Sequence, residues 1–224
     1  MDTSAVSVET ELFDALKHEL YTAVISDVLD GLGYRNQAMD TTLRPVYASA
    51  VVVGRAHTVL STDVYAIPTD PYTAEIAAID SLQPNDVLVA ATNHSQRTCF
   101  WGELLSTAAR ARGARGAVVD GHVRDVRQIT AMQFPVFATG MRPVDSLGRG
   151  LVIQHQQPVT CGGVLVRPGD IVFGDVDGLV VIPREVEQEA IARAREKVAG
   201  ENRVRQELER GDRLRDVFDR YGIL

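Results

Sequence analysis

Trp101-Gly102-Glu103-Leu104-Leu105, followed by Asp120-Gly121-His122-Val123-Arg124-Asp125, is the stretch that decides the fold. It predicts a helix that begins at Gly102, a short buried strand over 116–120 and a polar turn after that strand. Strands and helices that alternate in this way form a layered sheet, so the helix start and the Arg-Asp pair should meet at one end of it. The first turn of a helix has backbone N–H groups without an intrahelical acceptor and can therefore hold a carboxylate.

Arg124 and Asp125 have complementary chemistry for one ligand. The guanidinium of Arg124 can clamp a carboxylate in bidentate fashion, and the carboxylate of Asp125 can hold a hard divalent cation. An Arg-Asp pair is often only a salt-bridged helix cap, but its place directly after an apolar strand favours a ligand site. Glu103 either interacts with the helix dipole or faces the pocket and moves a proton through water. We therefore expect a small 2-oxo acid and Mg²⁺ to bind here.

Strands and helices also alternate on both sides of this stretch. Apolar spacing predicts helices over 10–32 (with a break near 22–27), 75–82, 102–112, 124–132 and 184–208, and a short helix after Gly211. Strands are expected over 50–54, 57–60, 86–90, 116–120, 135–137, 159–166, 170–173 and 179–182. The pattern predicts an α/β protein with layered β/β/α architecture, similar to a swivelling domain. We expect one domain over 1–224, in which 183–224 is a helical C-terminal extension.

Composition excludes several classes of protein. The 224 residues are 45% hydrophobic and 24% charged, which is enough for one large domain and its core. The net charge is −7, and region 184–224 is neutral, so no basic face is expected and nucleic acid is not an expected partner. There is no apolar run of about 18 residues and no apolar signal core at the start, so we expect no membrane span and a cytoplasmic protein.

Several other polar residues have a structural explanation beside the functional one. Cys99 and Cys161 are too few for a disulfide framework, although Cys99 is close enough to the motif to line the site. His122 is either a loop histidine or faces the same pocket as Arg124. Asp175 and Asp177 are arranged like a metal pair but also fit a hairpin turn. No glycine-rich nucleotide loop or nucleophile elbow is found, and no lysine lies near the motif to form a Schiff base.

These motifs, in this order, resemble the family that contains 4-hydroxy-4-methyl-2-oxoglutarate aldolase and the regulator of ribonuclease E activity A. The resemblance covers almost the whole chain, with matching motifs at 22–29, 101–105, 120–125, 168–170 and 175–183. Asp125 follows Arg124 as in the aldolases, whereas the ribonuclease regulators lack that carboxylate. The resemblance implies that Arg124 and the helix start bind pyruvate, that Glu103 joins a water network and that Asp125 binds Mg²⁺ or Mn²⁺. The helix-start residues are Gly102, Glu103, Leu104 and Leu105.

The resemblance also implies a homotrimer or homohexamer whose C-terminal helices pack on neighbouring subunits. Glu201 of an adjacent subunit would then complete the surroundings of the metal, with Glu196 and Glu207 as alternatives. The apolar stripe of the 184–208 helix likewise favours burial against a second subunit. The resemblance implies a small residue at the position of His122. This departure concerns the end of the substrate far from the pyruvate moiety, not the pyruvate moiety itself.

Together these patterns predict a divalent-metal-dependent (class II) pyruvate aldolase. Its substrates would be 4-hydroxy-2-oxo acids or diacids such as 4-hydroxy-4-methyl-2-oxoglutarate, cleaved to pyruvate and a second oxo acid. The same chemistry would decarboxylate oxaloacetate. Two alternatives remain open. One is a non-catalytic protein that regulates an RNA-processing enzyme through protein–protein contacts. The other is a different enolate reaction in the same pocket, such as hydrolysis or isomerisation.

Overall fold

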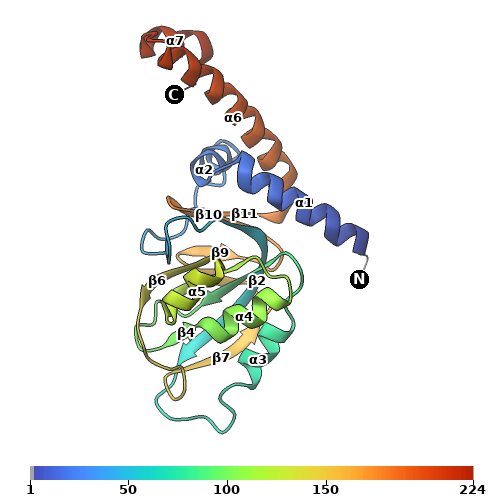
Figure 1. Ribbon diagram of the computed structural model, residues 1–224, viewed down its shortest axis with the longest axis vertical. Coiled ribbons are helices and arrows are strands. Elements are labelled where there is room, and N and C mark those ends of the chain that lie inside the picture. Colours follow the sequence, from blue (N-terminus) through green and yellow to red (C-terminus); the bar gives the residue numbers. More distant parts are fainter. Residues whose placement is uncertain (1–2, 224) are drawn as a thin grey trace.

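The frame of the molecule is a mixed β-sheet, seen in the computed structural model, which describes residues 3–223 (Figure 1). The strands are β1 (Arg44–Pro45), β2 (Val52–Asp63), β3 (Asp86–Ala91), β4 (Cys99–Trp101), β5 (Gly116–Val123), β6 (Val136–Met141), β7 (Gly150–His155), β8 (Val159–Cys161), β9 (Val164–Val166), β10 (Ile171–Asp175) and β11 (Gly178–Ile182). Within the described residues the main sheet has nine strands in the order β1-β6-β5-β3-β2-β10-β11, with β4 beside β5 and β7 beside β2. The central strands β2, β3, β5 and β6 are parallel. Strands β8 and β9 form a separate antiparallel hairpin.

Helices lie on one face of the sheet and around its β10–β11 end. They are α1 (Thr3–Glu19), α2 (Thr22–Gly31), α3 (Thr73–Asp80), α4 (Glu103–Ala111), α5 (Val126–Met132), α6 (Glu187–Glu209) and α7 (Leu214–Tyr221), with a 3₁₀ turn at Arg184–Val186. No helix within residues 3–223 is long and apolar enough to cross a membrane.

The central strands are buried on both faces, which produces the layers. In β3, Leu88 and Ala90 belong to the core under α3, α4 and α5. Val87 and Val89 of the same strand belong to the core that the β8–β9 hairpin covers. Because alternate residues of a strand face opposite sides, a strand buried on both faces reads as a continuous apolar run. The predicted β/β/α layering is therefore confirmed.

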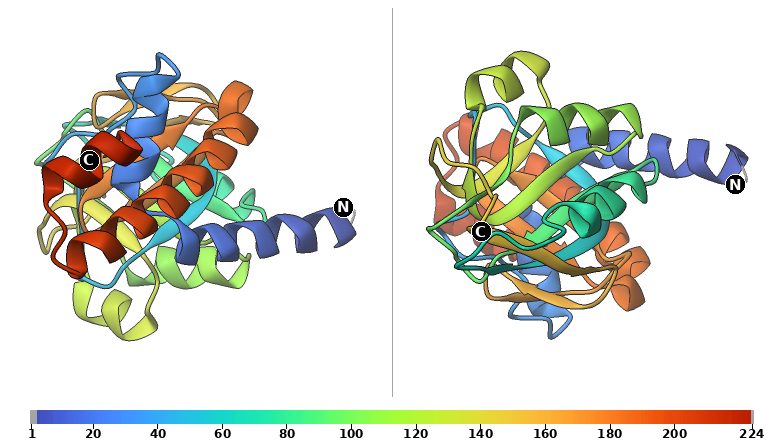
Figure 2. Two further views of the ribbon diagram at one scale, coloured as in Figure 1. Left: turned by 90° about the horizontal axis from the view of Figure 1, so that it is seen from above. Right: turned by 90° about the horizontal axis from the view of Figure 1, so that it is seen from below.

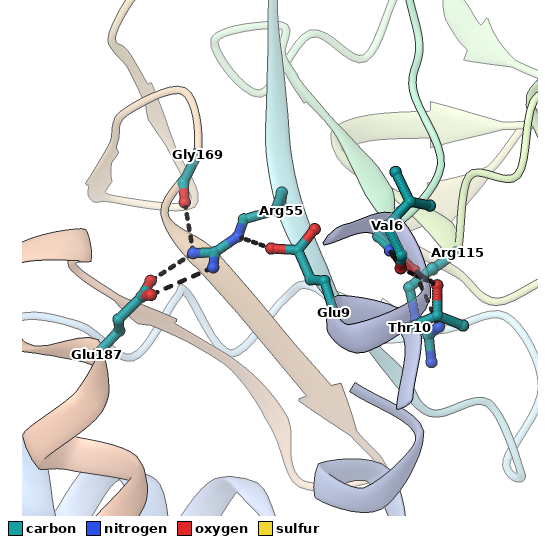
Figure 3. A network of polar contacts seen from close by, with 8 residues as sticks. Val6, Glu9, Thr10, Arg55, Arg115, Gly169 and Glu187 are labelled. Atoms are coloured by element: carbon teal, nitrogen blue, oxygen red, sulfur yellow. Dashed lines mark hydrogen bonds and ion pairs between the residues drawn. The ribbon is translucent and has the colours of Figure 1, made fainter. Parts of the chain in front are cut away.

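A third core joins the remaining helices to the β10–β11 end. Figure 1 shows α1, α2 and α6 gathered there, with α7 at the far tip of α6, and both views of Figure 2 show the start of α1 projecting from the body. Arg55 of β2 links two of these helices (Figure 3). Its Nε donates to Glu9 of α1 at 2.7 Å, and its other nitrogens bind Glu187 of α6 and the carbonyl oxygen of Gly169.

The apolar stripe of α6 does not need a second subunit to be buried. Ala190 and Ala194 lie in the core shared with α1, α2 and the last two strands of the sheet. This burial removes the argument that the stripe itself needs a neighbouring chain, because α2 of the same chain packs against α6. Whether α6 also packs on a neighbouring subunit stays a prediction. The N-terminal helix is broken in two as expected, but the break lies at 20–21 rather than within 22–27, since α1 ends at Glu19 and α2 begins at Thr22.

Two strands run further than expected. Region 50–60 was expected to hold two strands, over 50–54 and 57–60, but β2 runs unbroken from Val52 to Asp63. A Cβ on Gly54 would lie 2.4 Å from the carbonyl oxygen of Asn85, so this glycine permits a close approach rather than a turn. Likewise β5 continues through Asp120 and Gly121 to Val123. A Cβ on Gly121 would lie 2.5 Å from Thr92 Oγ1, so the predicted tight turn at this point is wrong.

Two short strands had no pattern strong enough to be predicted. Strand β4 lies between β3 and α4, so α4 does not follow β3 directly as expected. It pairs in parallel with the end of β5, which brings the start of α4 beside Arg124. Strand β7 pairs with the end of β2. The segment 159–166, expected as one strand, is a hairpin because Gly162 and Gly163 both have positive φ angles.

Candidate active site

The predicted site lies where β4 and β5 end and where α4 and α5 begin. The backbone N–H of Arg124 donates to the carbonyl oxygen of Trp101 at 2.9 Å, which holds the two strand ends together. Asp125, directly before α5, has a left-handed backbone conformation with φ 60°. A Cβ on Gly102 would lie 2.7 Å from Oδ2 of Asp125, so only glycine leaves room for this carboxylate at the start of α4.

The carboxylate of Asp125 lies at the N-terminus of α4. The backbone N–H of Glu103 donates to its Oδ2 at 3.2 Å. The first bond of the helical pattern runs from the N–H of Ser106 to the carbonyl oxygen of Gly102 at 3.1 Å. The N–H groups of Leu104 and Leu105 thus belong to the first turn, where a helix offers no acceptor and favours an anion.

The guanidinium of Arg124 lies between two carboxylates. Its Nε is 3.7 Å from Oδ2 of Asp125, and its Nη1 is 3.3 Å from Oδ1 of Asp145. Nη1 also donates to the carbonyl oxygen of Val144 at 3.3 Å. The side chains of Arg124 and Asp125 are 40% and 39% exposed, so both can reach a ligand without rearrangement of the core.

Arg124 and Asp125 border a cavity of about 210 Å³. Its lining also includes Tyr72, Glu75, Cys99, Phe100, Trp101, Gly102, Leu104, Leu105, Asp145 and Ser146. A water molecule takes about 30 Å³ of liquid volume, so the cavity has room for a small organic acid and a few waters. On the other side of the same pair lies a more open hollow of about 450 Å³, lined also by Val123, Val126, Met141, Arg142 and Pro143.

Sequence patterns did not single out three polar side chains of this cavity. Asp145, in the loop after β6, accepts a hydrogen bond from the hydroxyl of Tyr72 at 3.3 Å. Burial and the nearby Asp145 carboxylate raise the pKa of Glu75 to about 7, although Arg124 opposes that shift. Asp145 follows a parallel strand next to β5, and this position at the strand's carboxyl end could have identified it. Tyr72 and Glu75 have no comparable signal, because a loop and α3 carry them from a distant part of the chain.

The predicted residues of the Gly102 segment divide into two groups. Gly102, Leu104 and Leu105 line the cavity with Arg124 and Asp125. The carboxylate of Glu103 instead accepts a hydrogen bond from Thr107 Oγ1 at 2.8 Å and is not part of the lining. Cys99 does line the cavity, and burial raises the pKa of its thiol above the ordinary value.

Two other candidates lie elsewhere in the chain. His122 lines a separate cavity of about 270 Å³ with Asp40, His94 and Thr139, so the expectation that it faces the Arg124 pocket is wrong. Its ring packs over Gly140 on β6. Glu201 of α6 accepts a hydrogen bond from the hydroxyl of Tyr21 and lies 3.8 Å from Lys197 Nζ.

The alternatives to Glu201 also differ in their surroundings. Glu207 binds Tyr221 and Arg220 of α7, each at 2.8 Å, whereas Glu196 is exposed on α6. Whether any of the three reaches a neighbouring subunit's site stays a prediction.

Asp175 is held by its own chain. Its two carboxylate oxygens accept hydrogen bonds from the backbone N–H of Thr22 at 2.9 Å, from Thr22 Oγ1 at 2.7 Å and from the N–H of Asp177 at 2.9 Å. The first two cap the start of α2 and the third closes the β10–β11 turn, which supports the structural interpretation of this Asp pair.

The donor set around Asp125 suits a cation that is shared with a ligand. Within residues 3–223, no three His, Cys, Asp or Glu side chains are grouped so that they could hold a metal ion alone. Mg²⁺ commonly uses one or two protein carboxylates and completes its octahedron with water and ligand oxygens. The carboxylate of Asp125, which is partly exposed and borders the cavity, could therefore hold such an ion together with a ligand.

Comparisons with known proteins agree with the fold and the motifs. A family model described as RraA-like (Aldolase/RraA) matches residues 22–181. The chain is 34% identical over 178 residues to the "Putative 4-hydroxy-4-methyl-2-oxoglutarate aldolase" of Halalkalibacterium halodurans, and the match covers 80% of each chain.

Two solved structures extend the comparison. The Streptomyces coelicolor protein RraAS2, described as an unusual member of the RNase ES inhibitor RraA protein family, has a TM-score of 0.78 at 31% identity and covers 87% of this chain and 96% of its own. A structure described as novel cellulases from microbes associated with the gut ecosystem has a TM-score of 0.82 at 30% identity, with 87% and 86% covered. These matches support an aldolase or a regulator of the RraA type, and the chain belongs to the RraA-like family.

Proposed function

We propose that this chain is a divalent-metal-dependent pyruvate aldolase. It would cleave 4-hydroxy-2-oxo acids or diacids, such as 4-hydroxy-4-methyl-2-oxoglutarate, to pyruvate and a second oxo acid, with decarboxylation of oxaloacetate as a side activity. One observation carries the proposal: the carboxylate of Asp125, the guanidinium of Arg124 and the first turn of α4 border one small cavity. A 2-oxo acid bound to a metal ion requires groups that bind its carboxylate and, next to them, a residue that binds the metal.

Asp125 is the residue that would hold the metal, with Mg²⁺ or Mn²⁺ as the expected ion. When bound, a divalent cation acts as a Lewis acid that stabilises the negative charge on the 2-oxo oxygen during C–C cleavage. Glu201 of an adjacent subunit is proposed to complete its surroundings through water. This part of the proposal requires a homotrimer or homohexamer, as the family resemblance implies.

Each remaining residue of the site has a role set by its chemistry. The N–H groups in the first turn of α4 bind the carboxylate of the pyruvate moiety. Arg124 places positive charge near the oxygens where negative charge develops. Because the carboxylate of Glu103 is not part of the cavity lining, its proposed role is to orient a water that takes the proton from the substrate's 4-hydroxyl group. A Schiff-base route is disfavoured, because the only lysines of the chain are Lys17 of α1 and Lys197 of α6.

The second candidate function is a non-catalytic regulator of an RNA-processing enzyme. The description of the Streptomyces coelicolor relative as a member of an RNase ES inhibitor family favours it. Asp125 favours the aldolase instead, because its carboxylate accepts one backbone N–H at 3.2 Å and borders the cavity beside Arg124. Another enolate reaction in the same cavity would use the same residues.

The test is a pyruvate-release assay on purified protein. The substrate panel contains several 4-hydroxy-2-oxo acids and diacids together with oxaloacetate, each with Mg²⁺ and with a chelator. The proposal predicts release of pyruvate from at least one substrate, and loss of that activity with chelator. Equal rates with and without chelator would rule out the metal-dependent route. No release from any substrate would favour the regulator.

A further inference from the structure

Glu75 is a titratable side chain of the cavity to which the proposed function gives no role. It lies in the first turn of α3, is partly buried and lines the same cavity as Arg124 and Asp125. Within residues 3–223, its carboxyl group has neither a hydrogen-bond partner nor an ion pair. A carboxyl group that caps a helix or anchors a loop would have such partners, so a purely structural role does not explain it.

The groups around Glu75 disfavour its charged form. Two charged groups of the cavity act on it: Asp145 is a like charge that raises its pKa, and Arg124 is a positive charge that lowers it. The Nη1 of Arg124 already interacts with Asp145 and Val144 at 3.3 Å each. Tyr72, before α3, directs its hydroxyl to Asp145.

The other titratable groups of the cavity do not compensate. The thiol of Cys99 donates to the carbonyl oxygen of Arg142, and Asp125 binds the N–H of Glu103.

Burial is the dominant effect on the ionisation of Glu75. A carboxylate in the first turn of a helix is normally stabilised by the helix dipole, which would lower its pKa. The pKa of Glu75 is instead raised to about 7, first by burial and then by Asp145. A carboxyl group of this kind is protonated in a large share of molecules at neutral pH and can give its proton to a ligand in the cavity.

We propose that Glu75 exchanges a proton with the methylene carbon of the pyruvate enolate, an inference that rests on the function proposed above. After C–C cleavage, the enolate carbon takes the proton from the Glu75 carboxyl group, which yields the methyl group of pyruvate and leaves Glu75 as a carboxylate. Water then returns a proton to the carboxylate. In the reverse direction the carboxylate removes a proton from the methyl group. This proton is distinct from the one on the 4-hydroxyl that the water oriented by Glu103 would take.

Deuterium exchange into the methyl group of pyruvate isolates this step from C–C cleavage. Proton NMR of pyruvate in D₂O with Mg²⁺ follows loss of the methyl signal. Glu75→Gln keeps the size and polarity of the side chain but cannot transfer the proton, so the exchange rate should fall about 10²-fold or more. Glu75→Asp should retain a measurable part of the rate. Asp80→Asn is the matched control: Asp80 lies on the same helix but is exposed and pairs with Arg112, so this variant should exchange at the wild-type rate.

Carbon-13 NMR of the metal-free protein supplies a readout that does not depend on activity. The carboxyl resonance that is missing from Glu75→Gln should titrate near pH 7 in the wild-type protein, while the resonances of exposed glutamates titrate near their ordinary values. A Glu75 resonance that is fully ionised at about pH 5 would overturn the proposal.

The exchange experiment separates the two proposals. If wild-type protein and Glu75→Gln exchange equally fast, Glu75 is not the donor, but the proposed function stands. If wild-type protein shows neither metal-dependent exchange nor pyruvate release, the proposed function fails and the role of Glu75 fails with it. Loss of exchange in Glu75→Gln alone, with Asp80→Asn active, is the result we expect.

Discussion

Asp125 and Asp175 are both acidic residues at the end of a buried strand, yet the chain uses them differently. The two oxygens of Asp175 accept three hydrogen bonds of 2.7–2.9 Å, from the start of α2 and from its own turn. Asp125 accepts one N–H at 3.2 Å and lies 3.7 Å from a guanidinium nitrogen. A carboxylate that its own chain has satisfied would lose those bonds on binding a ligand. One that is held loosely beside a cavity is available to a cation.

Exchanging the carboxylate for an amide at each position should separate the two roles most strongly. Asp125→Asn should lower kcat/KM for pyruvate release by more than the about 10²–10³-fold expected for a single charge-stabilising donor, because the metal goes with it. Asp175→Asn is the matched control and should keep near wild-type kcat/KM in the folded protein. Comparable losses in both variants would remove the distinction between them.

Substitution of Arg124 tests whether Arg124, beside Asp125, acts on the substrate. Arg124→Ala should retain metal binding and lower kcat by about 10²–10³-fold, because one source of charge stabilisation is lost. Arg127→Ala changes an exposed arginine of α5 and should have no such effect. If Arg124→Ala leaves kcat/KM within about threefold, which is less than about 1 kcal/mol of transition-state stabilisation, Arg124 is only a structural cap.

Subunit mixing tests whether the Asp125 site is completed by another chain. Glu201→Ala should lower activity, while Glu209→Ala, an exposed change on the same helix, should not. Mixing inactive Asp125→Asn chains with Glu201→Ala chains should restore both carboxylates in about a quarter of the interfaces of a cyclic trimer. An active monomer in sedimentation, or no rescue after subunit exchange has been demonstrated, would contradict the shared site.

Substitution of Asp175 should lower the stability of the protein rather than its catalytic activity. Asp175→Ala removes the cap of α2 and should lower the free energy of unfolding by about 2 kcal/mol, measured by urea denaturation. Asp177→Ala is the neighbouring control. Its side chain is exposed, and its backbone makes the turn contacts, so its effect should stay within about 0.5 kcal/mol. The reverse order of the two effects would show that the turn, not the cap, is what matters.

The smallest expected effect is a pH dependence of stability that comes from Glu75. Its pKa is about 7 in the folded protein against an ordinary 4.5, so the folded state keeps a proton that the unfolded state releases between these values. Stability from this group is full below the lower value and is lost as the pH rises through the upper one. The Tm of Glu75→Gln relative to wild type should therefore rise from about pH 5 to about pH 8. A constant difference would show that Glu75 is not perturbed.

The β/β/α layers and the pairing of Arg124 with Asp125 at a strand end could be predicted from the sequence. Buried strands such as β3, which is apolar from Val87 to Ala91, can be recognised from the sequence. The segment from Gly102 to Asp125 marks the site through residue types that the fold then brings together. Gly121 was misread as part of a turn, whereas it permits a close approach to Thr92. A single sequence does not distinguish these two uses of glycine, because both need the missing Cβ.

The two other acidic side chains of the cavity could not be predicted, for a different reason. Glu75 and Asp145 are far apart in the chain and meet only because α3 and the loop after β6 pack over the same strand ends. The pKa of Glu75 is raised first by burial, and the extent of burial depends on the whole fold. His122, next but one to Arg124 in the sequence, faces another cavity. Arg124 lies beyond the end of β5 at Val123, so the alternation of strand side chains does not relate the two residues.

Direct binding of Mn²⁺ in the presence of pyruvate tests the central claim that Asp125, and not Asp175, is the metal ligand. Electron paramagnetic resonance would follow free Mn²⁺ in titrations of the wild type, Asp125→Asn and Asp175→Asn. We expect one strong binding event per chain in the wild type and in Asp175→Asn, and loss of most binding in Asp125→Asn. Wild-type affinity in Asp125→Asn, or loss of binding in Asp175→Asn alone, would contradict it.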